Sequence, residues 1–185
     1  MDKYYLNKDE ALLLIIDIQE RLVPVINKAD QVVKNTNVLI AMAIQMDIPI
    51  LLTEQYPKGL GSTMQEISDN LEGCSNYNKF EKNTFTGCTK ELTSTLKDLG
   101  RNKVILTGME THVCVYQTAR DLMKAGYQVI VANDGVSSRT VDNYKNGLDL
   151  MKDLGAVISN TETILFDLLK ESGTPQFRTL SKLIK

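Results

Sequence analysis

Three residues that lie far apart in the sequence carry side chains suited to hydrolysis: Asp17, Lys82 and Cys114. A cysteine attacks a carbonyl carbon as its thiolate, but an ordinary cysteine has a pKa of about 8.5 and is mostly protonated at neutral pH. Lowering that pKa by about two units requires about 2.7 kcal/mol of differential stabilisation. A helix start supplies only about 0.3 to 1 kcal/mol, so Cys114 would also need a cationic neighbour.

Cys114 closes the segment GMETHVC, which leads from a predicted strand into a predicted helix. We expect Thr111 to cap that helix and Cys114 to lie in its first turn, near free backbone N–H groups. Asp17 follows the most apolar predicted strand, and Lys82 lies in a connection just after a weaker extended segment. A buried structural cysteine, a turn aspartate and a solvated lysine are the ordinary interpretations of these residues taken singly.

The elements that must position these side chains alternate along the chain, as in a sheet built from βα units. Strands are predicted at residues 12–16, 50–53, 77–80, 104–107, 129–132 and 156–158, and helices at 32–46, 92–99, 111–126, 144–151 and 161–169, the last capped by Thr161. Residues 55–63 are predicted to form a loop. The pattern predicts one α/β domain over residues 1–185, a three-layer α/β/α arrangement around a mostly parallel, Rossmann-like sheet of about six strands. Ligands bind outside the carboxyl ends of such strands, where Asp17 and Cys114 are expected.

The charge and the cysteine content of the chain limit the kinds of partner that it could bind. The chain is 43% apolar and carries a net charge of −2, with no cluster of lysine and arginine, so neither nucleic acid nor a membrane is expected as a partner. The three cysteines, Cys74, Cys88 and Cys114, have an odd number and irregular spacing, which fit neither a disulfide framework nor a zinc ribbon. With no signal segment at the N-terminus, the sequence predicts a cytoplasmic protein that acts on a small molecule.

The motifs together are more specific than any one of them. An apolar strand ending in D-x-Q with Gln19, a lysine shortly before a phenylalanine, and G-x-x-T-x-x-C-V at a helix start occur here in order. Over roughly residues 10–170 the chain resembles the isochorismatase-like cysteine hydrolases. The strings TEQYPKGLG and GMETHVCVYQTARDL are most similar to the subgroup of isochorismatase domain-containing hydrolases.

The resemblance implies an isochorismatase-like hydrolase fold and a catalytic triad of Asp17, Lys82 and Cys114. It further implies a cis peptide bond between Met109 and Glu110, which would turn the Glu110 amide so that the N–H groups of Glu110 and Cys114 form an oxyanion hole. No cofactor is expected. We expect a homo-oligomer, either a dimer or a tetramer.

The implied chemistry is amide hydrolysis through a covalent intermediate. Asp17 would accept the Cys114 proton, Lys82 would stabilise the anionic pair, and the thiolate would form a thioester while ammonia or an amine leaves. Asp17 would then activate the water that hydrolyses the thioester. The expected substrate is a small amide, ureide or carbamoyl compound, which makes the protein a hydrolase of C–N bonds other than peptide bonds.

The sequence differs from two well-defined enzyme classes of the superfamily, and these differences narrow the expected activity. Nicotinamidases hold a metal with an Asp-x-His motif and a further histidine, whereas this chain has the single histidine His112, so no metal site is expected. True isochorismatases generally lack the nucleophilic cysteine that Cys114 supplies. His112 is either a helix-start residue or a substrate contact. Gln19 could hydrogen-bond to the substrate near Asp17, whereas Tyr56, Phe85 and Met109 either line the pocket or are packing residues.

A non-catalytic function is the main alternative. A binding or scaffold protein could keep this fold and lose useful turnover, but it would have no physical need to retain Asp17, Lys82 and Cys114 together. A nucleotide-binding domain is disfavoured because the chain contains neither G-x-G-x-x-G nor G-x-x-x-x-G-K. The sequence therefore favours a cysteine hydrolase over a catalytically weak relative.

Overall fold

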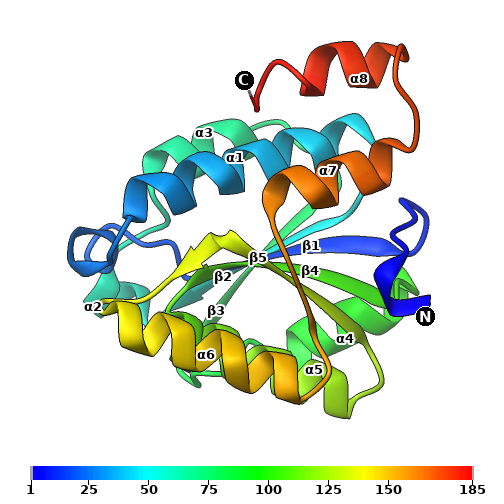
Figure 1. The fold of residues 1–185 in the computed structure, drawn as a ribbon. Coiled ribbons are helices and arrows are strands. Elements are labelled where there is room, and N and C mark those ends of the chain that lie inside the picture. Colours follow the sequence, from blue (N-terminus) through cyan, green and yellow to red (C-terminus); the bar gives the residue numbers. More distant parts are fainter. Residues whose placement is uncertain (1, 185) are drawn as a thin grey trace.

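A parallel sheet forms the centre of the molecule, and helices cover both of its faces (Figure 1). The computed structural model describes residues 2–184. The strands are β1 (Ala11–Ile16), β2 (Ile50–Gln55), β3 (Tyr77–Lys82), β4 (Lys103–Met109), β5 (Gln128–Ser137) and β6 (Val157–Ser159). They lie in the order β3-β2-β1-β4-β5-β6, and every neighbouring pair is parallel. The predicted three-layer α/β/α fold is confirmed.

The helices divide between the two faces (Figure 1). One face carries α1 (Ala29–Gln45), α3 (Gln65–Leu71), α7 (Thr161–Leu169) and α8 (Pro175–Leu180). The other carries α4 (Lys90–Leu99), α5 (Tyr116–Lys124) and α6 (Val141–Asp153). The short helix α2 (Pro57–Leu60), two 3₁₀ turns (Asp2–Tyr4 and Val23–Val25) and a π-helical turn (Thr111–Val115) complete the elements. No helix within residues 2–184 is long and apolar enough to cross a membrane.

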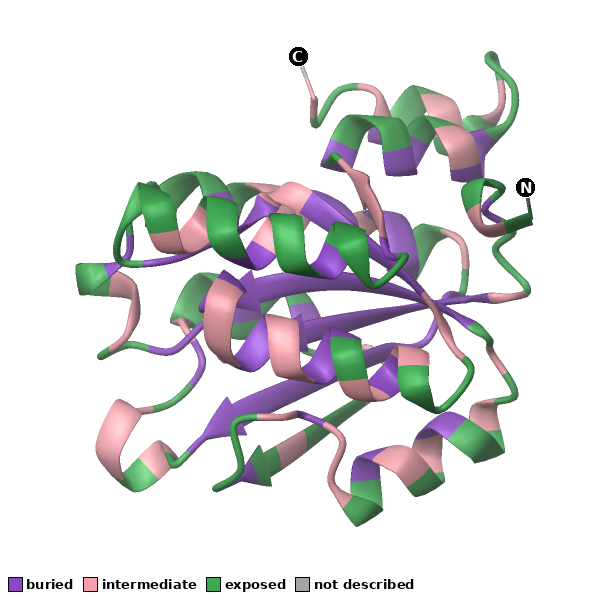
Figure 2. Cartoon of the chain, turned by 60° about the horizontal axis from the view of Figure 1, so that its bottom comes forward, coloured by how far each residue is buried: buried purple, intermediate pink, exposed green. Residues whose placement is uncertain are grey.

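The central strand β1 explains why the sheet needs two covering layers. All six of its side chains are buried, and they point alternately into two separate cores. Leu13 and Ile15 join the core under α1, while Leu12, Leu14 and Ile16 join the core under α5. A strand that is apolar on both faces is stable only between two layers of helices, and Figure 2 shows the sheet enclosed in this way. Asp17 therefore directly follows a strand whose side chains are all buried.

A glycine lets β4 approach β1 near the edge where both strands end. Gly108 has φ +130°, and a Cβ atom there would lie 2.0 Å from the carbonyl oxygen of Ile16. Only glycine fits both the backbone angle and the close contact. This approach brings the end of β4, and the turn that follows it, beside Asp17.

Several local predictions differ from the structure. The side chain of Asn160, rather than that of Thr161, caps α7 by accepting a hydrogen bond from the Thr163 N–H. The predicted loop at 55–63 contains the short helix α2. Helices α3 and α8, of seven and six residues, were not predicted, because so few turns show little periodicity.

Candidate active site

Asp17 and Lys82 form a buried ion pair at the carboxyl edge of the sheet. The Nζ atom of Lys82 lies 2.7 Å from Oδ2 of Asp17, and both side chains are fully buried. Lys82 was expected in a connection after the third strand, but it is the last residue of β3, where it pairs with Gln55 of β2. Because β2 separates β3 from β1 in the sheet, the lysine reaches across one strand to the aspartate.

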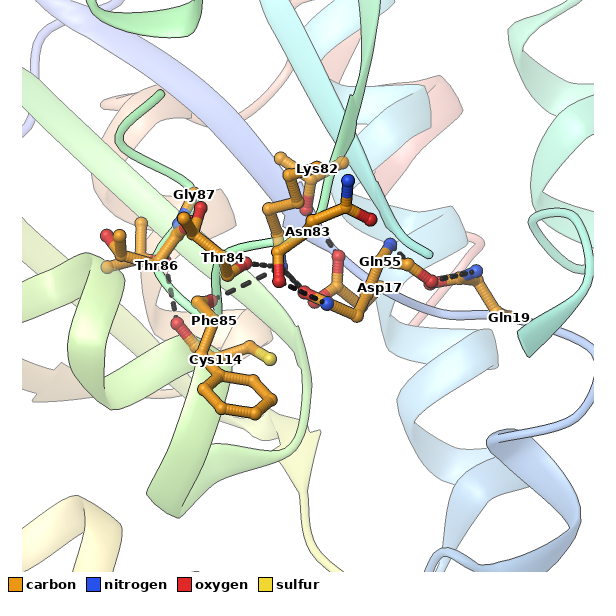
Figure 3. Close-up of polar contacts among 12 residues, drawn as sticks. Asp17, Gln19, Gln55, Lys82, Asn83, Thr84, Phe85, Thr86, Gly87 and Cys114 are labelled. Carbon is orange, nitrogen blue, oxygen red and sulfur yellow. Dashed lines mark hydrogen bonds and ion pairs between the residues drawn. The ribbon is translucent and has the colours of Figure 1, made fainter. Parts of the chain in front are cut away.

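Lys82 has more acceptors than it has N–H groups. Besides Asp17, its Nζ atom contacts Gln55 Oε1 at 2.7 Å and the carbonyl oxygens of Thr84 and Phe85 at 3.3 and 3.2 Å (Figure 3). An ammonium group has three N–H donors, and all of them are used by protein acceptors. Lys82 therefore supplies positive charge to the site and orients Asp17, and it has no donor left for a substrate.

Asp17 is held on both carboxylate oxygens. The Thr53 hydroxyl donates a hydrogen bond of 2.7 Å to Oδ1, while Lys82 holds Oδ2. Burial raises the pKa of the Asp17 carboxyl above its ordinary value, although Lys82 and the hydrogen bonds act in the opposite direction. A raised pKa makes the carboxylate a better proton acceptor. Thr53 and Gln55 were not predicted as site residues. Their signal was their polar character at the end of an otherwise apolar strand.

Cys114 lies beside this pair, in a π-helical turn rather than in the first turn of an α-helix. Figure 3 shows its side chain pointing toward Asp17 and Lys82. Thr111 does not cap the helix as predicted, because its hydroxyl has no hydrogen-bond partner within residues 2–184. The turn changes the backbone conformation at Cys114 but keeps this residue at the carboxyl edge of the sheet.

The expected lowering of the Cys114 pKa is wrong. Burial, and after it the negative charge of Asp17, raise the pKa of the thiol to about 12, because the positive charge of Lys82 only partly offsets these two effects. Since Lys82 is already paired with Asp17, it cannot supply the net positive field that a free thiolate requires. Cys114 is only 7% exposed and rests as a thiol next to a carboxylate that can accept its proton.

The peptide bond between Met109 and Glu110 is cis, as the resemblance implied. The Glu110 N–H donates to no acceptor within residues 2–184. The Glu110 carboxylate accepts hydrogen bonds from the backbone N–H and Nε of Arg139, at 3.0 and 3.1 Å. The side chain is thus tied to Arg139, whereas the backbone donor remains directed to no protein group.

Two of the expected substrate contacts have structural roles instead. Gln19 is fully buried; its amide nitrogen donates to the carbonyl oxygens of Gln55 and Gly61, and its oxygen accepts from the Gln55 N–H. It anchors the loop that follows β2. Met109 is also fully buried and packs in the core under α1. Neither side chain is placed to touch a substrate.

The other expected contacts are accessible. Tyr56 and Phe85 are 54% and 56% exposed, on the segments that directly follow β2 and β3. His112 is half-buried, and its Nδ1 atom lies 3.0 Å from Oγ of Ser138. Within residues 2–184, no cluster of three or more histidine, cysteine, aspartate or glutamate side chains has the arrangement of a metal site.

Comparisons with known proteins identify relatives of this chain. A protein-family model described as the isochorismatase domain matches residues 11–163, a range that includes Asp17, Lys82 and Cys114. The secreted isochorismatase effector Isc1 of Phytophthora sojae is 37% identical over 179 residues, covering 95% of this chain and 84% of that protein. Isochorismatase family protein 1A of Dictyostelium discoideum is 35% identical over 180 residues, covering 96% and 87%. The structure described as the MAR1 ribonuclease from Caenorhabditis elegans has a TM-score of 0.92 and 34% identity, covering 97% of this chain and 92% of that one.

Proposed function

Because the chain belongs to the isochorismatase domain family, we propose that it is a cysteine hydrolase that cleaves a small amide, ureide or carbamoyl compound through a thioester on Cys114. The observation that carries the proposal is the contact of Lys82 with Asp17 next to a buried thiol. An ion pair with no exposed surface costs desolvation energy and adds little to stability, so it is better explained by chemistry than by folding.

Because Cys114 rests as a protonated thiol, the first step must remove its proton. As Sγ of Cys114 attacks the carbonyl carbon, its proton passes to the Asp17 carboxylate, and the carbonyl oxygen becomes an anion. The N–H groups of Glu110 and Cys114 would stabilise this oxyanion. During this step one negative charge leaves Asp17 and passes through the attacking sulfur of Cys114 to the substrate. The positive charge of Lys82 balances that negative charge throughout, so the net charge of the site does not change.

The same carboxyl group completes the cycle. When the C–N bond breaks, the leaving nitrogen takes the proton from Asp17 and departs as ammonia or an amine. A water molecule then attacks the thioester and gives a proton to Asp17. The C–S bond breaks, Asp17 returns that proton to Sγ of Cys114, and the carboxylic or carbamic acid product leaves. Asp17 carries every proton transfer in this cycle, so no second acid or base is required.

The exposed residues near the site support a neutral substrate. Tyr56 and Phe85 offer aromatic surface, and the Glu110 carboxylate is already paired with Arg139. A compact, partly apolar acyl group with a planar amide or ureido end suits such surroundings. Three cysteines that are all free fit the reducing cytoplasm that we propose as its location.

The proposal is tested with a panel of short amides, ureides and carbamoyl compounds, scored for release of ammonia or amine and, by intact-mass spectrometry, for a thioester. Cys114→Ala should abolish turnover and the adduct. Cys88→Ala is the matched control, since Cys88 is also a free thiol with a raised pKa, about 11, but it is half-buried and lies outside the proposed triad. Activity should survive exhaustive chelation of metals.

Two outcomes would contradict the proposal. One is equal turnover by Cys114→Ala and the wild type, and the other is activity that chelation removes and zinc restores. Because the relative from C. elegans is described as a ribonuclease, RNA is included in the panel. RNA cleavage that is independent of Cys114, with no turnover of any amide, would replace thioester chemistry. Failure with every compound would favour the alternative, a catalytically weak binding or scaffold protein.

A further inference from the structure

Thr118, a fully buried residue of α5, joins two segments of the candidate site through one hydroxyl group. Its Oγ1 atom donates a hydrogen bond of 2.6 Å to the carbonyl oxygen of Cys114 and accepts one of 2.7 Å from the Gly87 N–H. The hydroxyl therefore donates to the turn that contains Cys114 and accepts from the loop that follows β3, so it links these two segments.

That loop also holds Lys82. Residues 83–87 form the first part of the connection from β3 to α4, and the carbonyl oxygens of Thr84 and Phe85 accept hydrogen bonds from the Lys82 ammonium (Figure 3). The loop is fixed at one end by Lys82 and at the other by Thr118. A shift of the loop would thus move two of the four acceptors of Lys82 and, with them, the partner of Asp17.

The packing against Thr118 is tight. A Cβ atom at Gly87 would lie 3.2 Å from Thr118 Oγ1 and 3.3 Å from its methyl carbon. A side chain at this position would push the loop away from α5, so glycine allows the backbone N–H to reach the hydroxyl. The hydrogen bond and the close contact together hold the loop against the turn of Cys114.

We propose that Thr118 is a positioning residue that keeps the loop at 83–87 closed over Cys114 and aligned with the Asp17–Lys82 pair. Its effect on catalysis rests on the proposed function, but its effect on the thiol does not. Burial is the largest cause of the raised pKa of Cys114, so opening the loop should lower that pKa and expose the sulfur. Loss of the hydroxyl should therefore make the thiol more reactive toward a simple reagent while the enzyme becomes slower.

The experiment measures both properties in Thr118→Val, which removes the hydroxyl at nearly constant shape, and in Thr118→Ser, which keeps it. Labelling of Cys114 by iodoacetamide at mildly alkaline pH is followed by peptide mapping, with Cys74 as an internal reference. Thr95→Val is the matched control, because the Thr95 hydroxyl also bonds the carbonyl four residues earlier, but this hydrogen bond on α4 is exposed to solvent. Folding of every variant is checked by circular dichroism.

Thr118→Val should label Cys114 faster, by about tenfold for each unit by which the thiol pKa falls. Its kcat should fall by about 10- to 100-fold, as expected when reacting groups are displaced by up to about 1 Å. Thr118→Ser and Thr95→Val should behave like the wild type. Gly87→Ala, which displaces the loop from the other side, should change labelling in the same direction and replaces Thr118→Val if that variant does not fold.

Unchanged labelling of Cys114 in a folded Thr118→Val or Gly87→Ala protein would overturn the proposal, and so would a serine variant that behaves like the valine variant. These results do not require a substrate. If no amide is turned over by the wild type but labelling responds as expected, the proposed function fails while the positioning role of Thr118 stands.

Discussion

The Lys82 ammonium has three N–H groups, and four protein acceptors lie within hydrogen-bond distance of it. Its role therefore differs from the proposed roles of Asp17 and Cys114. In the proposed mechanism, the Lys82 ammonium is occupied by protein acceptors and does not bind the substrate, so proton transfer falls to Asp17. Sequence motifs placed these two residues and Cys114 in one site, but they implied an activated thiolate. The actual protonation state depends on burial and on which charge Lys82 already balances, and neither can be read from motif spacing.

The pH dependence of kcat/KM tests this division of roles. Asp17 must be ionised to accept the thiol proton, and burial raises its pKa above 3.8, so activity should be lost as pH falls through this raised value. On the alkaline side, the thiol pKa of about 12 means that Cys114 stays protonated over the working range, and activity should reach a plateau. Asp17→Asn should reduce the rate of thioester formation by about 10²- to 10⁴-fold. A rate that instead rises tenfold per pH unit up to pH 10 would indicate attack by a pre-formed thiolate.

At the scale of elements, continuous apolar runs predicted where the buried strands lie, because a parallel strand covered on both faces has no polar alternation. Strand β5 was predicted too short, at 129–132, because its second half, from Asn133 to Ser137, is mostly polar. Edge strand β3 was predicted too short, since its sequence YNKFEK is half-exposed and mostly polar. That error placed Lys82 outside the sheet. Gln55 could not be identified as a partner of Lys82, nor Thr53 as a partner of Asp17, because these contacts depend on the pairing of β2 with β3 and with β1. The π-helical turn depends on tertiary packing and has no signature in the local sequence.

Helix α6 packs against that turn through Gly147. A Cβ atom at this position would lie 2.8 Å from backbone atoms of Thr111 and His112. Gly147→Ala should therefore displace the nucleophile turn and reduce kcat by about 10- to 100-fold, although alanine favours a helix by about 1 kcal/mol. Asn146→Ala, on the exposed side of α6, is the control and should leave kcat unchanged. Steady-state kinetics with thermal melts would detect the effect, and full activity of a folded Gly147→Ala protein would contradict the packing argument.

At the scale of the whole molecule, the sheet ends at an unprotected strand. β6 pairs only with β5, has three residues, and leaves its other edge free within residues 2–184. Hollows of about 720 and 400 Å³ on the two sides of β6 are both lined by Val157, Ile158 and Tyr4. Exposed apolar side chains surround this edge, including Tyr4 at 61% and Phe166 at 41%. A free strand edge within apolar surface is a site at which protein chains associate.

We therefore predict that the protein is a homo-oligomer, a dimer or a tetramer, and that the β6 edge takes part in its interface. Val157→Lys should shift the mass measured by light scattering toward the monomer, because a buried lysine without a partner is costly and charged edge residues oppose strand pairing. Ile44→Lys, at an exposed aliphatic position on α1, is the matched control and should leave the mass unchanged. A wild-type protein that is monomeric at micromolar concentration would contradict the prediction. An oligomer that resists Val157→Lys but dissociates with Ile44→Lys would place the interface on the α1 face instead.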